Sequence, residues 1–283
     1  MDKGYVLHTY PYRETSLILQ VWTEKHGRLG LVAKGARRPK SASRSVLIPF
    51  QPLVLDWFGR GELRTLKTAE PASPATPLGG QSLLSAFYLN ELLLKLTTRD
   101  DPHEGLFAAY DDAITALRAI TRASVIPADA GIQPGPPPSR GRQEEARGRQ
   151  EEARGRQEEA RGRQDEVEPV LRRFELRLLQ ELGYAVELTR EATTHAPIVA
   201  EREYLYVVER GPIPAPGEGQ TPANAVRLSG LTLIDLDRGH LEDAATVAQA
   251  KQLMRLRLNR SLNGQELATR AMVRDLQRLE DSL

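Results

Sequence analysis

The chain of 283 residues contains no cysteine, only 5% aromatic residues and no long apolar run. Without cysteine it cannot form a disulfide bond, a thiolate nucleophile or a cysteine-based zinc site. No apolar run approaches the roughly 20 residues that a membrane-spanning helix needs, so we expect no membrane partner. The N-terminal MDKGYVLHTYPYRETS lacks the apolar core of a signal peptide. These features favour a cytoplasmic protein.

Motifs for catalysis are also missing. The five histidines are scattered, without the HExxH or HxH spacing of a metal site. No GxxxxGK[ST] loop for nucleotide phosphates and no GxSxG nucleophile motif occurs. The sequence thus gives no argument for an enzyme, and we expect no catalytic residue, metal, cofactor or small-molecule substrate.

Positive charge is concentrated near the N-terminus, although the whole chain carries a net charge of only +1. Residues 1–80 hold 12 Lys/Arg and 6 Asp/Glu, a net of +6, which leaves 27 basic and 32 acidic residues, a net of −5, in the remainder. Within this N-terminal segment, residues 25–44 contain seven Lys/Arg and no acid. Such asymmetry is typical of a surface that contacts a polyanion. The alternative is a solvated basic loop that serves only solubility.

The first 70 residues show the alternation and β-branched or aromatic content of five strands, interrupted by turn residues. The predicted strands are Tyr5–Tyr10, Thr15–Thr23, Arg28–Lys34, Pro49–Phe58 and Glu62–Glu70. Five short strands with a long loop after the third suit an OB-fold barrel, which binds oligonucleotides on one face. An SH3-like barrel fits the strand count almost as well. We assign residues 1–77 to this nucleic-acid-binding domain.

The charge and the barrel together predict a clamp for phosphates in the third strand and the loop after it. Its candidate residues are Arg28, Lys34, Arg37, Arg38, Lys40 and Arg44. Tyr10 and Tyr12, on either side of Pro11 at a strand end, are candidates for stacking on bases. Trp22 is expected in the core instead.

Residues 78–283 predict a helical domain. Apolar periodicity indicates helices over Leu78–Leu96, Glu104–Ile120, Pro169–Leu182 and from Asp243 to the C-terminus, with a break at Asn263-Gly264. A small β-region at about 195–240 contains the predicted strands Glu203–Glu209 and Arg227–Leu236 around a Pro/Gly loop, Gly211–Pro222. Arg255, Arg257 and Arg260 are a weaker candidate for a second phosphate contact.

An insert at 124–166 interrupts the helical domain. RGRQEEA occurs there three times without change from Arg140 to Ala160, and a fourth, altered copy ends at Val167. Each copy offers one weakly apolar residue and one glycine, so no seam of a coiled coil can form. We expect a disordered insert without a function of its own.

Two segments, GYVLHTYPYRETSLILQVWTEKHGRLGLVAKGARRPKS and LIPFQPLVLDWFGRGELRTLKTAE, resemble the N-terminal domain of the RecO family of bacterial recombination mediators. FELRLLQELGYAVEL and RLRLNRSLNGQELATRAMV resemble its helical core and C-terminal helix. The resemblance covers residues 1–122 and 168–283.

The resemblance implies an α+β protein, with an OB-fold followed by a helical bundle and a small β-region. Some members hold zinc there through four cysteines; this chain has none and is expected to be zinc-free. The implied function is DNA repair: binding single- and double-stranded DNA, annealing complementary strands and, with RecR, helping RecA to replace single-strand-binding protein (SSB). The C-terminal tail of SSB is implied to bind at Leu171, Arg172 and Leu176, although packing is the simpler role for Leu176. The alternatives are an OB-fold module that binds RNA without annealing, and a nucleic-acid hydrolase or transferase.

Overall fold

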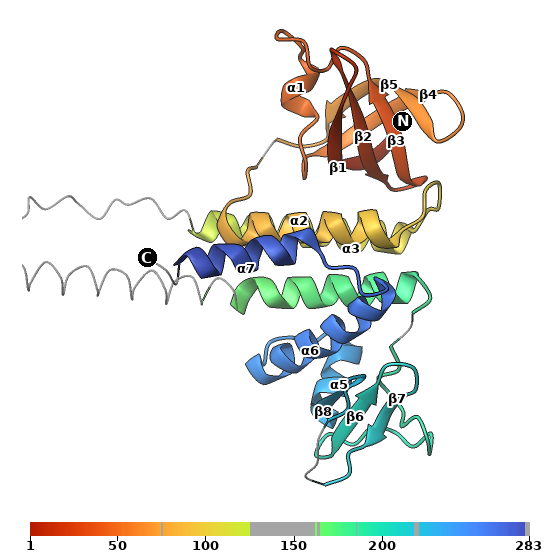
Figure 1. Cartoon of the computed structure of the whole chain (residues 1–283), viewed down its shortest axis with the longest axis vertical. Helices are drawn as coiled ribbons and strands as arrows, with labels where there is room; N and C mark the ends of the chain where they lie inside the picture. Colours follow the sequence, from red (N-terminus) through yellow and green to blue (C-terminus); the bar gives the residue numbers. More distant parts are fainter. Residues whose placement is uncertain (75, 125–161, 163–164, 185, 218–220, 281–283) are drawn as a thin grey trace, which may run out of the picture.

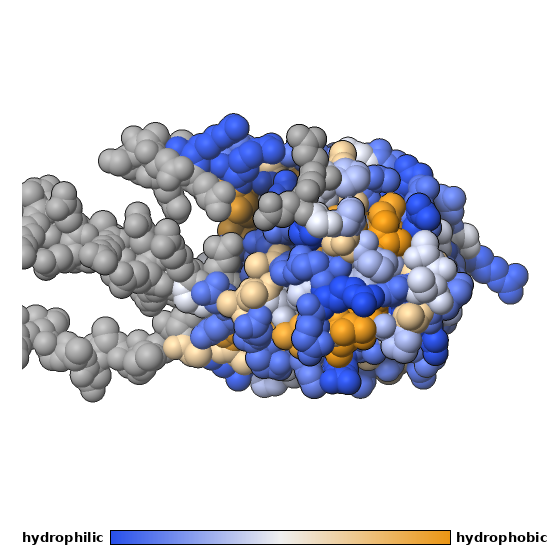
Figure 2. Space-filling view, turned by 90° about the horizontal axis from the view of Figure 1, so that it is seen from below, coloured by the Kyte–Doolittle hydropathy of each residue, from blue (hydrophilic) through white to orange (hydrophobic). Residues whose placement is uncertain are grey.

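The computed structural model describes residues 1–74, 76–124, 162, 165–184, 186–217 and 221–280. Figure 1 shows a β-barrel at one end, a layer of roughly parallel helices in the middle and a small three-stranded sheet at the other end. Seen from the end that carries the small sheet, the surface is largely hydrophilic, and its apolar residues stand apart from one another (Figure 2). In the described part of the chain, no helix is long and apolar enough to cross a membrane.

The barrel confirms the five-stranded prediction. Its strands are β1 (Asp2–Tyr12), β2 (Ser16–Thr23), β3 (Gly27–Ala33), β4 (Pro52–Phe58) and β5 (Leu63–Pro71). They close in the order β1-β2-β3-β5-β4, with β3 and β5 parallel and the other pairs antiparallel. The long connection between β3 and β4 contains a short helix, α1 (Ser43–Val46). This is the closed five-stranded architecture expected for an OB-fold.

Alternation along the strands separates two apolar faces. In β2, Leu19 and Val21 point into the barrel and belong to its interior cluster, with Leu29, Leu31, Leu53 and Leu55 from the neighbouring strands. The next residue, Trp22, is fully buried as predicted, but it belongs to the cluster that the barrel shares with the helices. Tyr5, Leu7 and Phe50 of the barrel join it there. One outer face of the barrel is therefore a packing surface.

The helices that cover this face are α2 (Gly80–Leu96) and α3 (Glu104–Ser124). Asn90, 2% exposed, joins them to the barrel: its Nδ2 donates to the Leu7 carbonyl at 2.9 Å, and its Oδ1 accepts from the Tyr110 hydroxyl at 2.6 Å. The Tyr5 hydroxyl donates to Asp111 in addition. Burial of Tyr5 and its bond to Asp111 raise the pKa of that phenol.

The remaining helices complete the central layer. A helix covers residues 165–181, and the predicted stop, Gly183, follows it with φ of +77°. The helices α6 (Ala244–Ser261) and α7 (Ala268–Glu280) come later in the chain. Asp243 caps α6 by accepting from the Thr246 N–H at 2.8 Å. Met254, Leu258 and Leu262 lie on one face and are buried, which confirms the apolar stripe read from the sequence.

The small sheet contains β6 (Glu203–Val207), β7 (Gly211–Pro214) and β8 (Ala225–Ser229), in the order β7-β6-β8. Two predictions are wrong here. Gly211–Pro214 was expected in a loop but forms the edge strand, a position that tolerates proline. The predicted strand Arg227–Leu236 ends at Ser229 and continues as a helix, α5 (Gly230–Arg238).

The switch from strand to helix has a local cause. The Ser229 hydroxyl accepts from the Thr232 N–H at 3.1 Å and caps α5. A Cβ on Gly230 would lie 1.9 Å from the Val199 carbonyl oxygen, so only glycine permits this close turn. Leu233 and Leu236 then bury one helical face.

The predicted insert is too wide at both ends. Ser124 belongs to α3, and residues 165–166 belong to the helix that follows. Val167, the last residue of the altered fourth repeat, is 1% exposed and part of the core. The expectation of disorder for the rest of the insert falls on 125–161 and 163–164, which lie outside the described residues.

A carboxylate organises the small β-region. Glu191, 3% exposed, accepts from the Thr194 hydroxyl at 2.5 Å and pairs with the Arg202 guanidinium at 3.0 Å. The Tyr204 hydroxyl donates to it at 3.3 Å. Among the described residues, no three His, Asp or Glu side chains form a group that could hold a metal. Polar side chains thus tie the loop before β6 to the sheet.

The Asn90 junction predicts a measurable loss of stability. Asn90→Ala should lower the free energy of unfolding by about 2–4 kcal/mol, because the Leu7 carbonyl and the Tyr110 hydroxyl would each lose a buried partner. Denaturant unfolding of the whole protein measures the change. Gln180→Ala, on an exposed helix position, is the control and should stay within about 0.5 kcal/mol. An equally small change for Asn90→Ala would contradict the assigned role.

Candidate nucleic-acid interface

The loop that follows β3 carries five of the six predicted phosphate contacts: Lys34, Arg37, Arg38, Lys40 and Arg44. Consecutive turns shape it, with backbone bonds from the Arg38 N–H to Gly35 O (3.1 Å), from Ser41 to Arg38 (3.0 Å) and from Arg44 to Ser41 (3.2 Å). The buried side chains of Ala36 and Leu47 belong to the interior cluster of the barrel and anchor the loop there. We call this segment, residues 34–44, the basic loop.

All five cations of the basic loop are exposed, and none of them forms an ion pair within the described part of the chain. Arg37 also fixes the loop to the neighbouring turn between β1 and β2. Its N–H donates to the Thr15 carbonyl at 2.9 Å, and its guanidinium donates to the Arg13 carbonyl at 3.3 Å. This contact with its backbone places Arg13, which no sequence pattern marked, next to the basic loop.

The sixth predicted contact, Arg28, lies apart from the basic loop, near the start of β3. It is half-buried, donating to the Gln20 side-chain oxygen at 3.3 Å and to the Thr97 carbonyl at 2.8 Å. Burial and then the nearby charge of Arg99 lower the pKa of the Arg28 guanidinium. The structure therefore places Arg28 beside Arg99, which follows α2, and not beside the loop cations. No local pattern in the sequence marks Arg99, because its position depends on how the helices meet the barrel.

The two predicted stacking residues differ in the contacts that their rings make. Tyr10 is 47% exposed, and its ring lies edge-on to His8 with centroids 4.4 Å apart. The Tyr12 ring is covered on one side by the Arg13 guanidinium, 5.2 Å from its centroid. Tyr10 and Arg28 line the same pocket, so the structure brings together one aromatic and one cationic candidate.

A second candidate site is a cleft of about 610 Å³ among the helices. Leu171 and Arg172 of the predicted SSB-tail contacts line it, whereas Leu176 packs against the hydrophobic core. Further cations at its rim are Lys251, Arg255, Arg270 and Arg274, and Leu84, Leu267 and Val273 add apolar surface. The cleft thus combines apolar walls with an excess of positive charge.

A buried charge network forms one wall of the cleft. Arg172, 5% exposed, pairs with Glu175 at 2.8 Å, and the Tyr88 hydroxyl donates to the same carboxylate at 2.5 Å. Burial raises the pKa of Glu175 although Arg172 opposes the shift. Removing one member would leave the other charge buried without compensation, so Arg172 has a structural role in addition to any contact with a ligand.

The three arginines of α6 do not form one phosphate-binding row. Arg257 donates to the carbonyls of Val208 and Tyr184, and Arg260 pairs with Glu209. Only Arg255 lines the cleft.

Glu91 of α2 holds α7 in place at the cleft. Its carboxylate accepts from the N–H groups of Ala268 and Thr269 at 2.8 and 2.9 Å and from the Thr269 hydroxyl at 2.7 Å. Partial burial raises the pKa of Glu91, but the bonds from Thr269 and Ala268 outweigh this effect, and the net pKa lies below its ordinary value. A negative charge at the start of a helix also suits the helix dipole.

Comparison with known proteins gives consistent matches along both parts of the chain. Residues 1–75 match the family described as recombination protein O N terminal, and residues 161–270 match recombination protein O C terminal. A protein named DNA repair protein RecO from Azoarcus sp. is 42% identical over 275 residues, covering 97% of this chain and 95% of its own. Proteins of the same name from Nitrosospira multiformis and Chromobacterium violaceum are each 40% identical, over 98% of this chain.

The Glu91 contact predicts a pH-dependent contribution to stability. A carboxylate with a lowered folded-state pKa stabilises the fold above its unfolded pKa, and this contribution disappears as the pH falls through the folded value. Glu91→Gln should therefore reduce the free energy of unfolding at pH 7 by about 0.5–2 kcal/mol, in the range of helix caps. The difference from the unmodified protein should shrink below about pH 4. Denaturant unfolding at both pH values checks this, and a difference independent of pH would refute it.

Proposed function

Because the chain belongs to the recombination protein O (RecO) family, we propose that it is a recombination mediator in DNA repair. In this role it binds single- and double-stranded DNA and anneals complementary strands. Together with RecR it helps RecA to replace SSB on single-stranded DNA. It acts in the cytoplasm, at the nucleoid during repair, and catalyses no covalent reaction.

The observation that carries the proposal is the basic loop, whose cations are exposed and have no acidic partner among the described residues. Phosphates can neutralise such cations and release their own condensed counterions, which gives affinity without reading the base sequence. Lys and Arg contacts also reduce the repulsion between two approaching phosphate backbones. Binding of this kind suits annealing, because the two strands must be held regardless of sequence until their bases pair.

The helical cleft supports a second part of the proposal, contact with the C-terminal tail of SSB. An acidic tail that ends in an apolar residue needs cations at the rim and apolar walls inside. Arg255 and Arg274 supply the first, and Leu84 and Leu171 supply the second. Arg172 shapes the wall of the cleft through its buried ion pair with Glu175. Leu176 stabilises the same helix by packing.

The first prediction concerns the salt dependence of DNA binding. Replacing Arg37, Arg38 and Lys40 together by alanine should lower the affinity for DNA and flatten the plot of log K against log salt. The slope should fall by up to about 2 for single strands and about 2.7 for duplexes, since each phosphate contact contributes roughly 0.7 and 0.9. Fluorescence anisotropy at several salt concentrations measures both.

A triple alanine variant of Arg122, Arg210 and Arg238 removes the same charge from exposed positions elsewhere. Its slope should match that of the unmodified protein. An unchanged slope in the loop variant would remove the basic loop from the interface. A clear preference for RNA over DNA of the same sequence would favour an RNA-binding module instead.

The second prediction concerns the SSB tail. Arg255→Ala should weaken binding of a peptide with the C-terminal SSB sequence roughly two- to fivefold, the range of an exposed ion pair. Arg260→Ala, an exposed position on α6 that does not line the cleft, is the control. Peptide anisotropy measures both variants. Equal affinities for the two would show that the tail binds elsewhere.

A further inference from the structure

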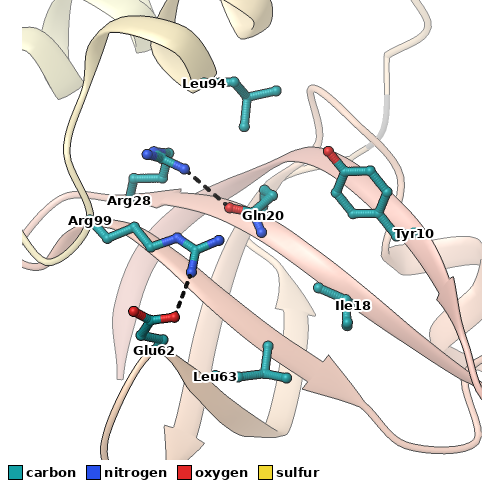
Figure 3. A pocket seen from close by; sticks show the side chains of 8 residues that line it. All are labelled: Tyr10, Ile18, Gln20, Arg28, Glu62, Leu63, Leu94 and Arg99. Atoms are coloured by element: carbon teal, nitrogen blue, oxygen red, sulfur yellow. Dashed lines mark hydrogen bonds and ion pairs between the residues drawn. The ribbon is translucent and has the colours of Figure 1, made fainter.

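The pocket that contains Tyr10 and Arg28 lies on the outer face of the barrel, at the edge of the part that the helices cover, and Leu94 of α2 also lines it. Its volume is about 500 Å³, within the 300–1,000 Å³ typical of pockets for small ligands. Figure 3 shows Arg28 and Arg99 on one side, Tyr10 and Ile18 on the other, Gln20 between the two sides and Leu63 below. The pocket therefore has a cationic side and an aromatic, apolar side.

The cationic side comes from two separate parts of the chain. Arg28 belongs to β3 and is held by Gln20 and by the Thr97 carbonyl at the end of α2. The side chain of Arg99, just beyond α2, is 39% exposed. Its ion pair with Glu62 of the barrel is a long one, at 3.7 Å. Each guanidinium repels the other, so an anion placed between them would be attracted by both.

The apolar side suits the flat face of a base. Tyr10 extends from β1, its register partner Ile18 from β2 and Leu63 from the start of β5. The edge-on contact with His8 orients the Tyr10 ring. Stacking on an aromatic side chain accepts any base, because every base has a π-face.

We propose that this pocket binds one unpaired nucleotide of a single strand, with its base against Tyr10 and its phosphate between Arg28 and Arg99. The inference rests on the proposed DNA-binding function and names the part of the ligand that the pocket takes. A base within a duplex is stacked and paired, and it would have to leave the helix to enter. The pocket thus adds affinity for single strands, whereas the basic loop binds the backbone of either form.

The position of the pocket gives a continuous path to the basic loop. Tyr10 is followed by Pro11, Tyr12 and Arg13, and the Arg13 carbonyl accepts from Arg37 of the loop. A strand with one nucleotide in the pocket can continue along this edge of the barrel. Because Arg28 and Arg99 come from the barrel and from the helical part, the bound nucleotide also connects the two.

The test compares the affinity of the protein for a 15-nucleotide oligothymidine with its affinity for a hairpin duplex. Tyr10→Ala should weaken binding of the single strand about fivefold or more, the lower range of base stacking, and change duplex binding less than twofold. Tyr10→Phe keeps the ring and should restore the single-strand affinity. Tyr184→Ala removes an equally exposed tyrosine, 48% against 47%, that does not line the pocket, and it should affect neither ligand.

Arg99→Ala tests the cationic side. It should lower the salt slope for the single strand by about 0.7 and leave the duplex slope unchanged. Arg173→Ala is the control, because Arg173 also makes an exposed 3.7 Å pair with a glutamate.

An oligonucleotide of the same length without bases tests the stacking side. It should bind the unmodified protein and Tyr10→Ala equally.

The outcomes separate this inference from the proposed function. If the protein binds both ligands and Tyr10→Ala weakens both equally or neither, the nucleotide pocket is refuted and the DNA-binding function stands. If the unmodified protein binds neither the single strand nor the duplex, the proposed function fails, and the inference fails with it.

Discussion

The packing of one outer face of the barrel onto α2 and α3 determines most of what the molecule can do. Alternation in β1 and β2 gives these strands apolar side chains on both faces, so Tyr5, Leu7 and Trp22 need a cover from outside. Asn90 fixes the orientation of the helices on the barrel through its buried hydrogen bonds to the Leu7 carbonyl and the Tyr110 hydroxyl. The uncovered remainder of the same face, with Gln20, Ile18 and Tyr10, becomes the floor and wall of a pocket. The junction also brings Arg99 next to Arg28.

The two candidate sites carry their positive charge in different settings. The basic loop displays exposed cations without acidic partners among the described residues, as a sequence-independent phosphate contact requires. In the helical cleft, cations stand beside apolar walls and a buried Arg172–Glu175 pair, which suits a short peptide with an acidic and an apolar part. In a mediator of the proposed kind, the two sites would hold DNA and SSB at once. The mediator would then stay near the strand that SSB leaves exposed.

Local patterns in the sequence predicted the barrel strands, the apolar stripe of α6 and the end of a helix at Gly183, because alternation, periodicity and glycine act within a few residues. They failed at LSGLTLIDL, which has strand-like composition but becomes α5 through the Ser229 cap and the close approach of Gly230 to Val199. They also grouped Arg28 with the loop cations, since adjacency in the chain says nothing of the Gln20 and Thr97 contacts that separate it. Arg13 and Arg99 could not be selected, because their positions depend on contacts between distant segments. For the same reason, no sequence pattern distinguished Arg255, which lines the cleft, from Arg257 and Arg260.

We claim above all that this chain anneals DNA strands and that it acts on SSB-coated strands by contacting the SSB tail. The most direct measurement follows fluorescence transfer between two complementary oligonucleotides coated with SSB, without ATP or metal. The account predicts that the protein accelerates annealing of the coated strands and that a competing SSB tail peptide abolishes this acceleration, while annealing of bare strands persists. If the protein accelerates annealing of neither coated nor bare strands, the claim is contradicted.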